Sequence, residues 1–113
     1  MLLSNGADVN ARGRHYGTAL QAASAGDHKK VVELLLSNGA DVNAQGGYHS
    51  TALQAASGGC HEKVVELLLS NGADVNTQGG RYGTALQAAS DGGHEKVVEL
   101  LLSNGADVSA RGG

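Results

Sequence analysis

Histidine and cysteine are the residue types in this chain of 113 residues that most readily bind metals or act as bases and nucleophiles. Three of its five histidines, His28, His61 and His94, recur at intervals of 33 residues. Equivalent positions of stacked repeats lie about 8–10 Å apart, whereas two ligands of one metal ion lie within about 4 Å of each other. This row therefore cannot hold one ion, and we expect each histidine to tie its turn to the neighbouring repeat.

The other reactive side chains form no catalytic constellation. Cys60 precedes His61, but neighbours in sequence rarely point at each other, and no third group orients the histidine. The glycine-rich segment 79–84 lacks the lysine of a phosphate-binding loop. We therefore predict no catalytic residue, no metal site and no cofactor, and a protein that is not an enzyme. The alternative of a free-standing enzyme would need an activity that is lost when Cys60 or the histidines are mutated.

The elements that carry these residues come from a unit of 33 residues. The phrase Gly-Ala-Asp-Val begins at Gly6, Gly39, Gly72 and Gly105. The first two units are identical at 25 of 33 positions and the last two at 27. We predict one domain, residues 1–113, with a partial repeat 1–5, full repeats 6–38, 39–71 and 72–104, and a partial repeat 105–113.

Each unit reads as helix, turn, helix and hairpin loop. Residues 18–24 form a short helix with Thr18 as its N-cap, and the alanines in it allow close approach of neighbouring backbones. Residues 31–36 are apolar at five of six positions, so this second helix must be buried on more than one side, and Gly39 ends it. Residues 8–17 read as an extended turn or hairpin. The fold class predicted is all-α, a solenoid in which neighbouring units cover each other's apolar helices, with Leu68 in its core.

Composition excludes several functions. With 8 basic and 11 acidic residues, the net charge of −3 does not suit a nucleic-acid binder. The longest uninterrupted apolar run is three leucines, far too short to cross a membrane. The single cysteine excludes a disulfide framework and fits a reducing interior, so we expect an intracellular, cytoplasmic protein.

These residues resemble the ankyrin repeat family. The resemblance is carried by the 33-residue length, by Gly-Ala-Asp-Val-Asn (39–43, 72–76), by Thr-x-Leu-x-x-Ala in the first helix, and by the histidine and Val-Val-x-Leu-Leu of the second. It implies a non-enzymatic scaffold that binds another protein through its hairpin tips and the concave face of its first helices.

Two departures from the family pattern matter. The family's Thr-Pro-Leu-His reads Thr-Ala-Leu-Gln at 18–21, 51–54 and 84–87. The resemblance implies that this weakens the start of the first helix and removes a side chain that makes hydrogen bonds between repeats. The family's glycine between the helices is kept at Gly93 but is Asp27 and Cys60 in the other repeats. We expect a left-handed backbone there, which Asp tolerates better than Cys.

A second hypothesis assigns the chain to a larger protein. Ala-Leu-Gln-Ala-Ala-Ser followed by His-Glu-Lys-Val-Val is similar to the ankyrin tails of fungal NACHT-type receptors of the STAND ATPase class. The chain also begins partway through a helix and stops within a turn, which favours a fragment. In this hypothesis the chain is a sensor tail, and the catalysis lies elsewhere in the larger protein.

The repeats differ from one another in the hairpin segments, in the turn between the helices and at the helix edge, and the hairpin segments contain every tyrosine and arginine. Tyr and Arg are enriched in binding hot spots, so we predict that this strip binds the partner, against the alternative of drift on a solvated surface. The predicted binding residues are Arg12, Arg14, His15, Tyr16, Tyr48, His49, Arg81 and Tyr82.

The ends of the stack carry apolar residues that no further unit covers. They are Leu2 and Leu3 at one end and Leu100 to Leu102 at the other. Exposed apolar faces favour association, so we expect modest stability and end-to-end contacts between copies.

Overall fold

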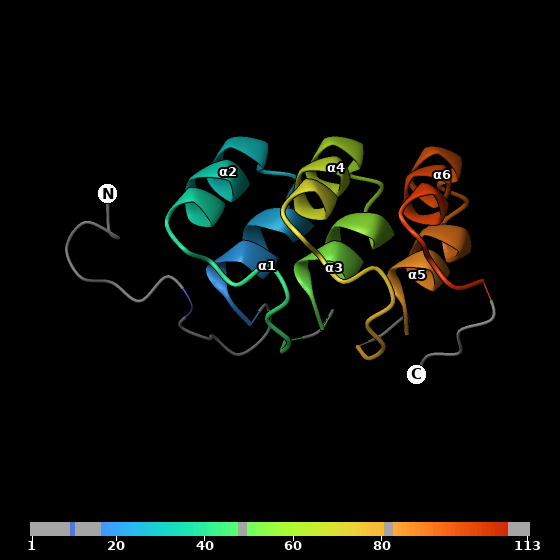
Figure 1. Cartoon of the computed structure of the whole chain (residues 1–113), viewed down its shortest axis with the longest axis horizontal. Coiled ribbons are helices and arrows are strands. Elements are labelled where there is room, and N and C mark those ends of the chain that lie inside the picture. The colour runs from blue at the N-terminus through green and yellow to red at the C-terminus, as the bar shows by residue number, and fades with distance from the viewer. Residues whose placement is uncertain (1–9, 11–16, 48–49, 81–82, 109–113) are drawn as a thin grey trace.

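Six helices in two layers make up the described part of the chain, a computed structural model that covers residues 10, 17–47, 50–80 and 83–108. They are α1 (Ala19–Ala25), α2 (Lys29–Ser37), α3 (Ala52–Gly58), α4 (Glu62–Ser70), α5 (Ala85–Asp91) and α6 (Glu95–Ser103). Helices α1, α3 and α5 lie side by side in one layer, and α2, α4 and α6 form the other (Figure 1). The predicted all-α solenoid is confirmed. None of these helices is long and apolar enough to cross a membrane.

Each first-layer helix begins at a threonine that caps it reciprocally. The Thr51 side chain accepts a hydrogen bond from the Gln54 backbone N–H, and the Gln54 side chain accepts one from the Thr51 N–H. The same capping box forms at Thr18 and Thr84. Thr18 is thus the N-cap, as predicted, and the capping box fixes the helix start without the family's proline.

The second-layer helices end where glycine was expected. Gly39 follows α2 with φ of 91°, a conformation that L side chains rarely adopt. The backbone N–H groups of Gly39 and Ala40 donate to the carbonyls of Leu36 and Leu35. This is the Schellman arrangement, which satisfies carbonyls that the helix itself leaves unpaired.

The core lies between the layers and between consecutive repeats. Val64, Val65 and Leu68 of α4 are fully buried, as are Leu53 and Ala56 of α3. Two neighbouring valines on one helix point in different directions, so α4 is buried from two sides at once. Small residues along α3 let α1 and α5 pack against it.

The ends of the stack differ from its middle. Val31 of α2 and Leu102 of α6 are exposed, and Leu100 is half-buried. Leu101 is fully buried, so the expectation that Leu100 to Leu102 are all uncovered is wrong for Leu101, which joins the core cluster. Leu2 and Leu3 lie outside the described residues.

The turn between the two helices of each repeat has the predicted left-handed residue. Cys60 has φ of 59° and Asp27 has φ of 60°, close to the 69° of Gly93. Gly59 has φ of −91°, so Cys60 and not Gly59 adopts the strained conformation. Gly59 is needed for space, because an added Cβ would lie 2.4 Å from Nε2 of His61.

Truncation of the central leucine should unfold much of the stack. We expect Leu68→Ala to cost roughly 2–5 kcal/mol in free energy of unfolding, because the cavity is enclosed on all sides. Leu34→Ala, at a leucine that is 44% exposed, should cost about 1 kcal/mol or less. Urea denaturation followed by circular dichroism measures both, and equal losses would contradict the packing of α4.

Relief of the strained turn should stabilise the protein. We expect Cys60→Gly to raise the free energy of unfolding by about 1 kcal/mol, because glycine adopts this φ without a clash of Cβ. Cys60→Ala is the control, since it removes the thiol and keeps Cβ. An equal gain in both variants would show that the thiol, and not the backbone, is the source of the strain.

Candidate protein-binding surface

The eight predicted binding residues lie outside the described residues, in segments 11–16, 48–49 and 81–82. They are Arg12, Arg14, His15, Tyr16, Tyr48, His49, Arg81 and Tyr82. Their assignment therefore stays a prediction. The structure does describe the residues on both sides of the last two segments, and so the framework that carries them.

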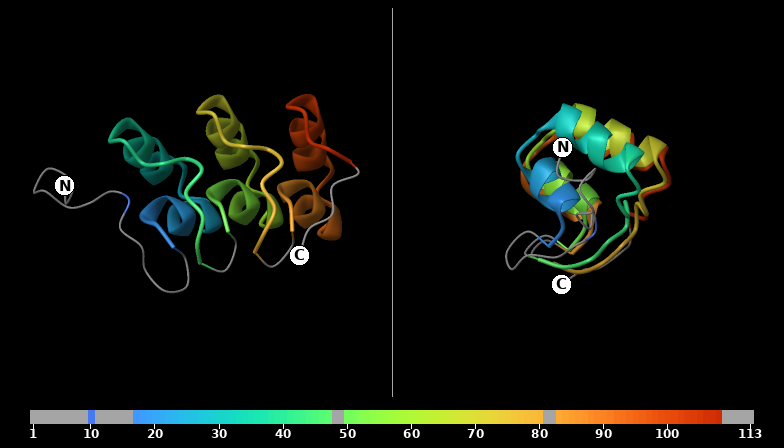
Figure 2. Two further views of the ribbon diagram at one scale, coloured as in Figure 1. Left: turned by 60° about the horizontal axis from the view of Figure 1, so that its bottom comes forward. Right: turned by 90° about the vertical axis from the view of Figure 1, so that its left-hand side faces the viewer.

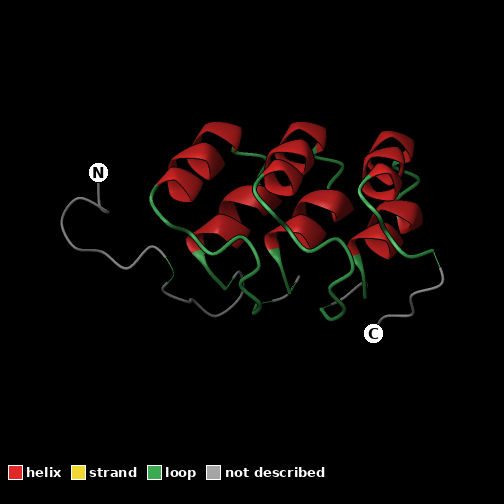
Figure 3. Ribbon diagram, viewed as in Figure 1, coloured by secondary structure: helices red, strands yellow, loops and turns green. Residues whose placement is uncertain are grey.

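Those flanking residues form the bases of two hairpins. The backbone N–H of Gly46 donates to the Ser50 carbonyl at 2.8 Å, and that of Gly79 donates to the Gly83 carbonyl at 2.9 Å. The predicted hairpins are thus confirmed for the second and third repeats. Both lie beside the first helix layer, on the side away from α2, α4 and α6 (Figure 2 and Figure 3).

Gln54 anchors the hairpin of the third repeat, whose base is Gly79 and Gly83, to the start of α3. Its side-chain Oε1 accepts from the backbone N–H of Thr51 at 3.0 Å, within the capping box. Its Nε2 donates across the repeat boundary to the carbonyls of Thr77, at 3.3 Å, and Gly79, at 3.0 Å, and also to that of Gly83. One buried amide therefore binds both sides of the hairpin base to the preceding helix.

Gln21 does the same one repeat earlier. Its Nε2 donates to the Gly46 carbonyl at 2.8 Å and to the carbonyl of Ser50, while its Oε1 accepts from Thr18 N–H. The family's histidine is absent at this position, as the sequence shows, but glutamine makes hydrogen bonds between repeats in its place. An amide carries both a donor and an acceptor, so it can close the capping box and reach the next hairpin at the same time.

The family assignment follows from this repeat framework together with a comparison of sequences. The family profile described as "Ankyrin repeats (3 copies)" matches residues 1–79 and again residues 47–112. The chain belongs to the ankyrin repeat family. Ankyrin repeats are generally protein–protein interaction modules. No curated protein matches the chain.

Two of the recurring histidines of this ankyrin chain, His61 and His94, tie their turns to the neighbouring repeat as predicted, whereas His28 makes no such bond among the described residues. Nε2 of His61 lies 2.9 Å from the Ala25 carbonyl oxygen, and Nε2 of His94 lies 3.1 Å from that of Gly58. A carbonyl only accepts, so each Nε2 carries the proton and donates to the preceding repeat. Nδ1 of His61 also lies 3.8 Å from the Asp27 carboxylate, a neighbour that the sequence did not reveal.

A third polar row, made of asparagines, was missed by the sequence analysis. Asn43 donates from Nδ2 to the Gly72 carbonyl at 3.2 Å and accepts at Oδ1 from the Asp74 backbone N–H at 2.6 Å. Asn76 repeats both contacts one unit later, with Gly105 and Asp107. The sequence did contain a signal for this row, because asparagine recurs every 33 residues at positions 10, 43 and 76. A loop that contacts only solvent does not require the same side chain in each repeat.

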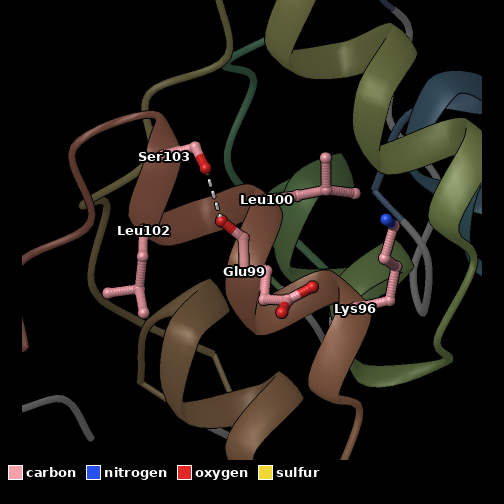
Figure 4. A pocket seen from close by; sticks show the side chains of 5 residues that line it. All are labelled: Lys96, Glu99, Leu100, Leu102 and Ser103. Carbon is pink, nitrogen blue, oxygen red and sulfur yellow. Dashed lines mark hydrogen bonds between the residues drawn. The ribbon is translucent and has the colours of Figure 1, made fainter.

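Among residues 10, 17–47, 50–80 and 83–108, no group of three His, Cys, Asp or Glu side chains could hold a metal ion. A depression of about 490 Å³ lies beside α6, lined by Lys96, Glu99, Leu100, Leu102 and Ser103 (Figure 4). All five come from one helix, and the Ser103 hydroxyl donates to the Glu99 backbone carbonyl at 2.8 Å. This depression is therefore a feature of the helix surface.

The first-helix face of the middle repeat offers a partner few side chains. Residues 52–57 of α3 are all buried, and only Gly58 at the end of the helix is half-buried. The equivalent positions in the neighbouring repeats are Ala25, half-buried, and Asp91, exposed. Larger side chains for a partner must therefore come from elsewhere on this edge.

The donor function of Gln54 can be tested apart from its capping function. Gln54→Glu keeps an acceptor for the capping box but replaces Nε2 by a carboxylate oxygen that faces backbone carbonyls. We expect a loss of about 3 kcal/mol in free energy of unfolding, since a buried charge is left without a donor. Gln78→Glu, at an exposed position, adds the same charge and should change stability by about 0.5 kcal/mol or less. Equal denaturation midpoints for the two variants would refute the anchoring role.

Proposed function

We propose that this ankyrin module is a non-enzymatic scaffold that binds another protein through its hairpin edge. The proposed contact residues are Arg12, Arg14, His15, Tyr16, Tyr48, His49, Arg81 and Tyr82. The observation that supports this proposal best is the anchoring of consecutive hairpin bases by Gln21 and Gln54. When the base of a hairpin is fixed to the helices, the hairpin loses less conformational entropy on binding a partner, and this favours affinity.

The shape of this edge favours a protein surface over a small molecule. Equivalent points of consecutive repeats lie about 8–10 Å apart, which gives a row and not an enclosed pocket. The row contains tyrosine, histidine and arginine, so it suits an extended or convex surface with some acidic groups. The middle helix α3 has its side chains buried, so the hairpins supply most of the contact and the first-helix face little.

The absence of catalysis is part of the same proposal. His61 and His94 are engaged with backbone carbonyls of the preceding repeats, which supports a structural role over a chemical one. We further propose that the protein acts inside the cell, in the cytoplasm, which a single cysteine favours. Copies also associate through the ends of the stack, for which the exposure of Val31 and Leu102 is the supporting observation.

A second candidate function is the sensor tail of a larger fungal STAND ATPase receptor. The supporting observation is the pairing of Ala-Leu-Gln-Ala-Ala-Ser with His-Glu-Lys-Val-Val in the sequence. An upstream phosphate-binding loop in a longer open reading frame would favour this candidate. A stop codon and no such loop upstream would refute it.

Loss of three hairpin side chains should abolish binding without unfolding the protein. A pull-down with the wild-type chain supplies the partner, and its affinity is then measured with purified proteins. We expect the triple variant Arg14→Ala, Tyr48→Ala and Arg81→Ala to bind at least 100-fold more weakly, because each hot-spot side chain contributes about 2 kcal/mol.

The matched control changes three cations on the opposite layer. Lys30, Lys63 and Lys96 are exposed on α2, α4 and α6, and their replacement by alanine should leave binding unchanged. Circular dichroism should give the same helical signal for all three proteins. Wild-type affinity in the hairpin variant, or equal losses in both variants, would refute the proposed edge.

A further inference from the structure

The two ends of the stack are complementary to each other because the repeats are nearly identical. We define the N-side face as the residues of the first helix pair that point away from the second, and the C-side face as those of the last pair that point away from the middle one. The N-side face consists of Ala19, Ala22, Val31 and Leu34, and the C-side face of Leu86, Ser90, Val98 and Leu102. Each face has an equivalent inside the chain that is covered by another repeat.

The N-side face is exposed only at the first repeat. Val31 is 47% exposed, whereas its equivalents Val64 and Val97 are 0% exposed. Ala19 is exposed, while its equivalent Ala52 is buried where α3 packs on α1. What covers these positions inside the chain is therefore the preceding repeat.

The C-side face shows the reverse pattern. Val98 is half-buried, whereas its equivalents Val32 and Val65 are fully buried. Ser90 is exposed, while Ser57 is fully buried. What covers these positions inside the chain is therefore the following repeat.

We propose that copies of this chain stack head to tail, with the C-side face of one copy on the N-side face of the next. This inference rests on the end association of the proposed function and adds its direction and residues. Helices α5 and α6 of one copy would pack on α1 and α2 of the next, as α1 packs on α3 and α2 on α4 within the chain. The side chains are the same as at the internal boundary, so both partners of each apolar contact are already present.

A polar contact at the junction fixes the register. Inside the chain, His61 and His94 donate to backbone carbonyls of the preceding repeat, at Ala25 and Gly58. His28 occupies the same position in the first repeat and makes no such bond among the described residues. In the head-to-tail contact its Nε2 meets the Asp91 carbonyl of the preceding copy, which is the equivalent of Ala25 and Gly58.

The direction of the contact decides the kind of assembly. Contact between unlike faces is heterologous, so each added copy leaves one face of each kind free and the assembly stays open. A symmetric dimer would instead place two N-side faces or two C-side faces together. No repeat boundary in the described chain has that arrangement.

Variants that block one face at a time test the direction. The N-blocked variant carries Val31→Glu and Leu34→Glu, and the C-blocked variant carries Leu102→Glu and Val108→Glu. Val108 follows α6 and belongs to the same end, because its equivalents Val42 and Val75, each followed by another repeat, are half-buried. All four replaced residues are 43–75% exposed, so both variants should keep the helical signal of the wild type. If either unfolds, serine at the same positions removes the apolar surface without adding charge.

Sedimentation velocity over a wide concentration range gives the readout. We expect the wild-type mass to rise with concentration beyond that of a dimer, and each blocked variant to stay at the monomer mass of 11.3 kDa. An equimolar mixture of the two variants should form a species of twice that mass that grows no further. This is expected because the mixture offers one free N-side face and one free C-side face.

The other outcomes distinguish the association of the ends from its head-to-tail direction. Self-association of either blocked variant overturns the head-to-tail direction, while the association itself stands. A wild-type chain that is monomeric at every concentration overturns end association altogether, and leaves hairpin binding to be judged by its own variants. A mixture that stays monomeric while the wild type associates shows that these faces are not the ones in contact.

Discussion

The apolar second helix of each repeat is the constraint on which the rest of this structure depends. In α4, Val64 and Val65 are adjacent and both fully buried, so two sides of the helix, about 100° apart, need cover. Its own partner α3 covers one side only, and the neighbouring repeats supply the rest. A single repeat would leave this surface in water, and the hydrophobic gain arises only when repeats stack.

Apolar stacking is driven by the hydrophobic effect, which has no direction of its own, so further contacts help to align the repeats. Three rows of polar contacts supply the alignment. Glutamine Nε2 binds the next hairpin, histidine Nε2 binds the previous turn, and asparagine Nδ2 binds the next loop. The three rows lie at different places on the repeat, so together they set both spacing and rotation between neighbours. Directional hydrogen bonds supply what the non-directional hydrophobic effect cannot.

This division of roles explains where variation is tolerated. The residues that stack and align are the same in every repeat, as in Thr-Ala-Leu-Gln-Ala-Ala-Ser and Val-Val-Glu-Leu-Leu-Leu-Ser-Asn. The hairpin segments between the anchored bases are where the side chains differ most from repeat to repeat. Variation of this kind suits the partner-binding edge that we propose.

Local sequence determined the elements of this protein. Thr18 and Gln21 three residues later specify a helix start, Gly39 specifies a helix end, and the valines and leucines of the second helix specify its burial. The left-handed turn at Cys60 also followed from position within the repeat. These features depend on residues only a few positions apart, so the printed sequence contains all of their causes.

The tertiary structure decided what the recurring polar residues contact. Gln54 reaches Gly79 and Asn43 reaches Gly72, partners 25 and 29 residues away, and no local pattern names them. Stacking also gives equivalent residues different burial. Val31 is exposed and Val64 is buried, although the residues around them are almost the same. Burial depends on what lies across the repeat boundary, and that is a property of the stack and not of the local sequence.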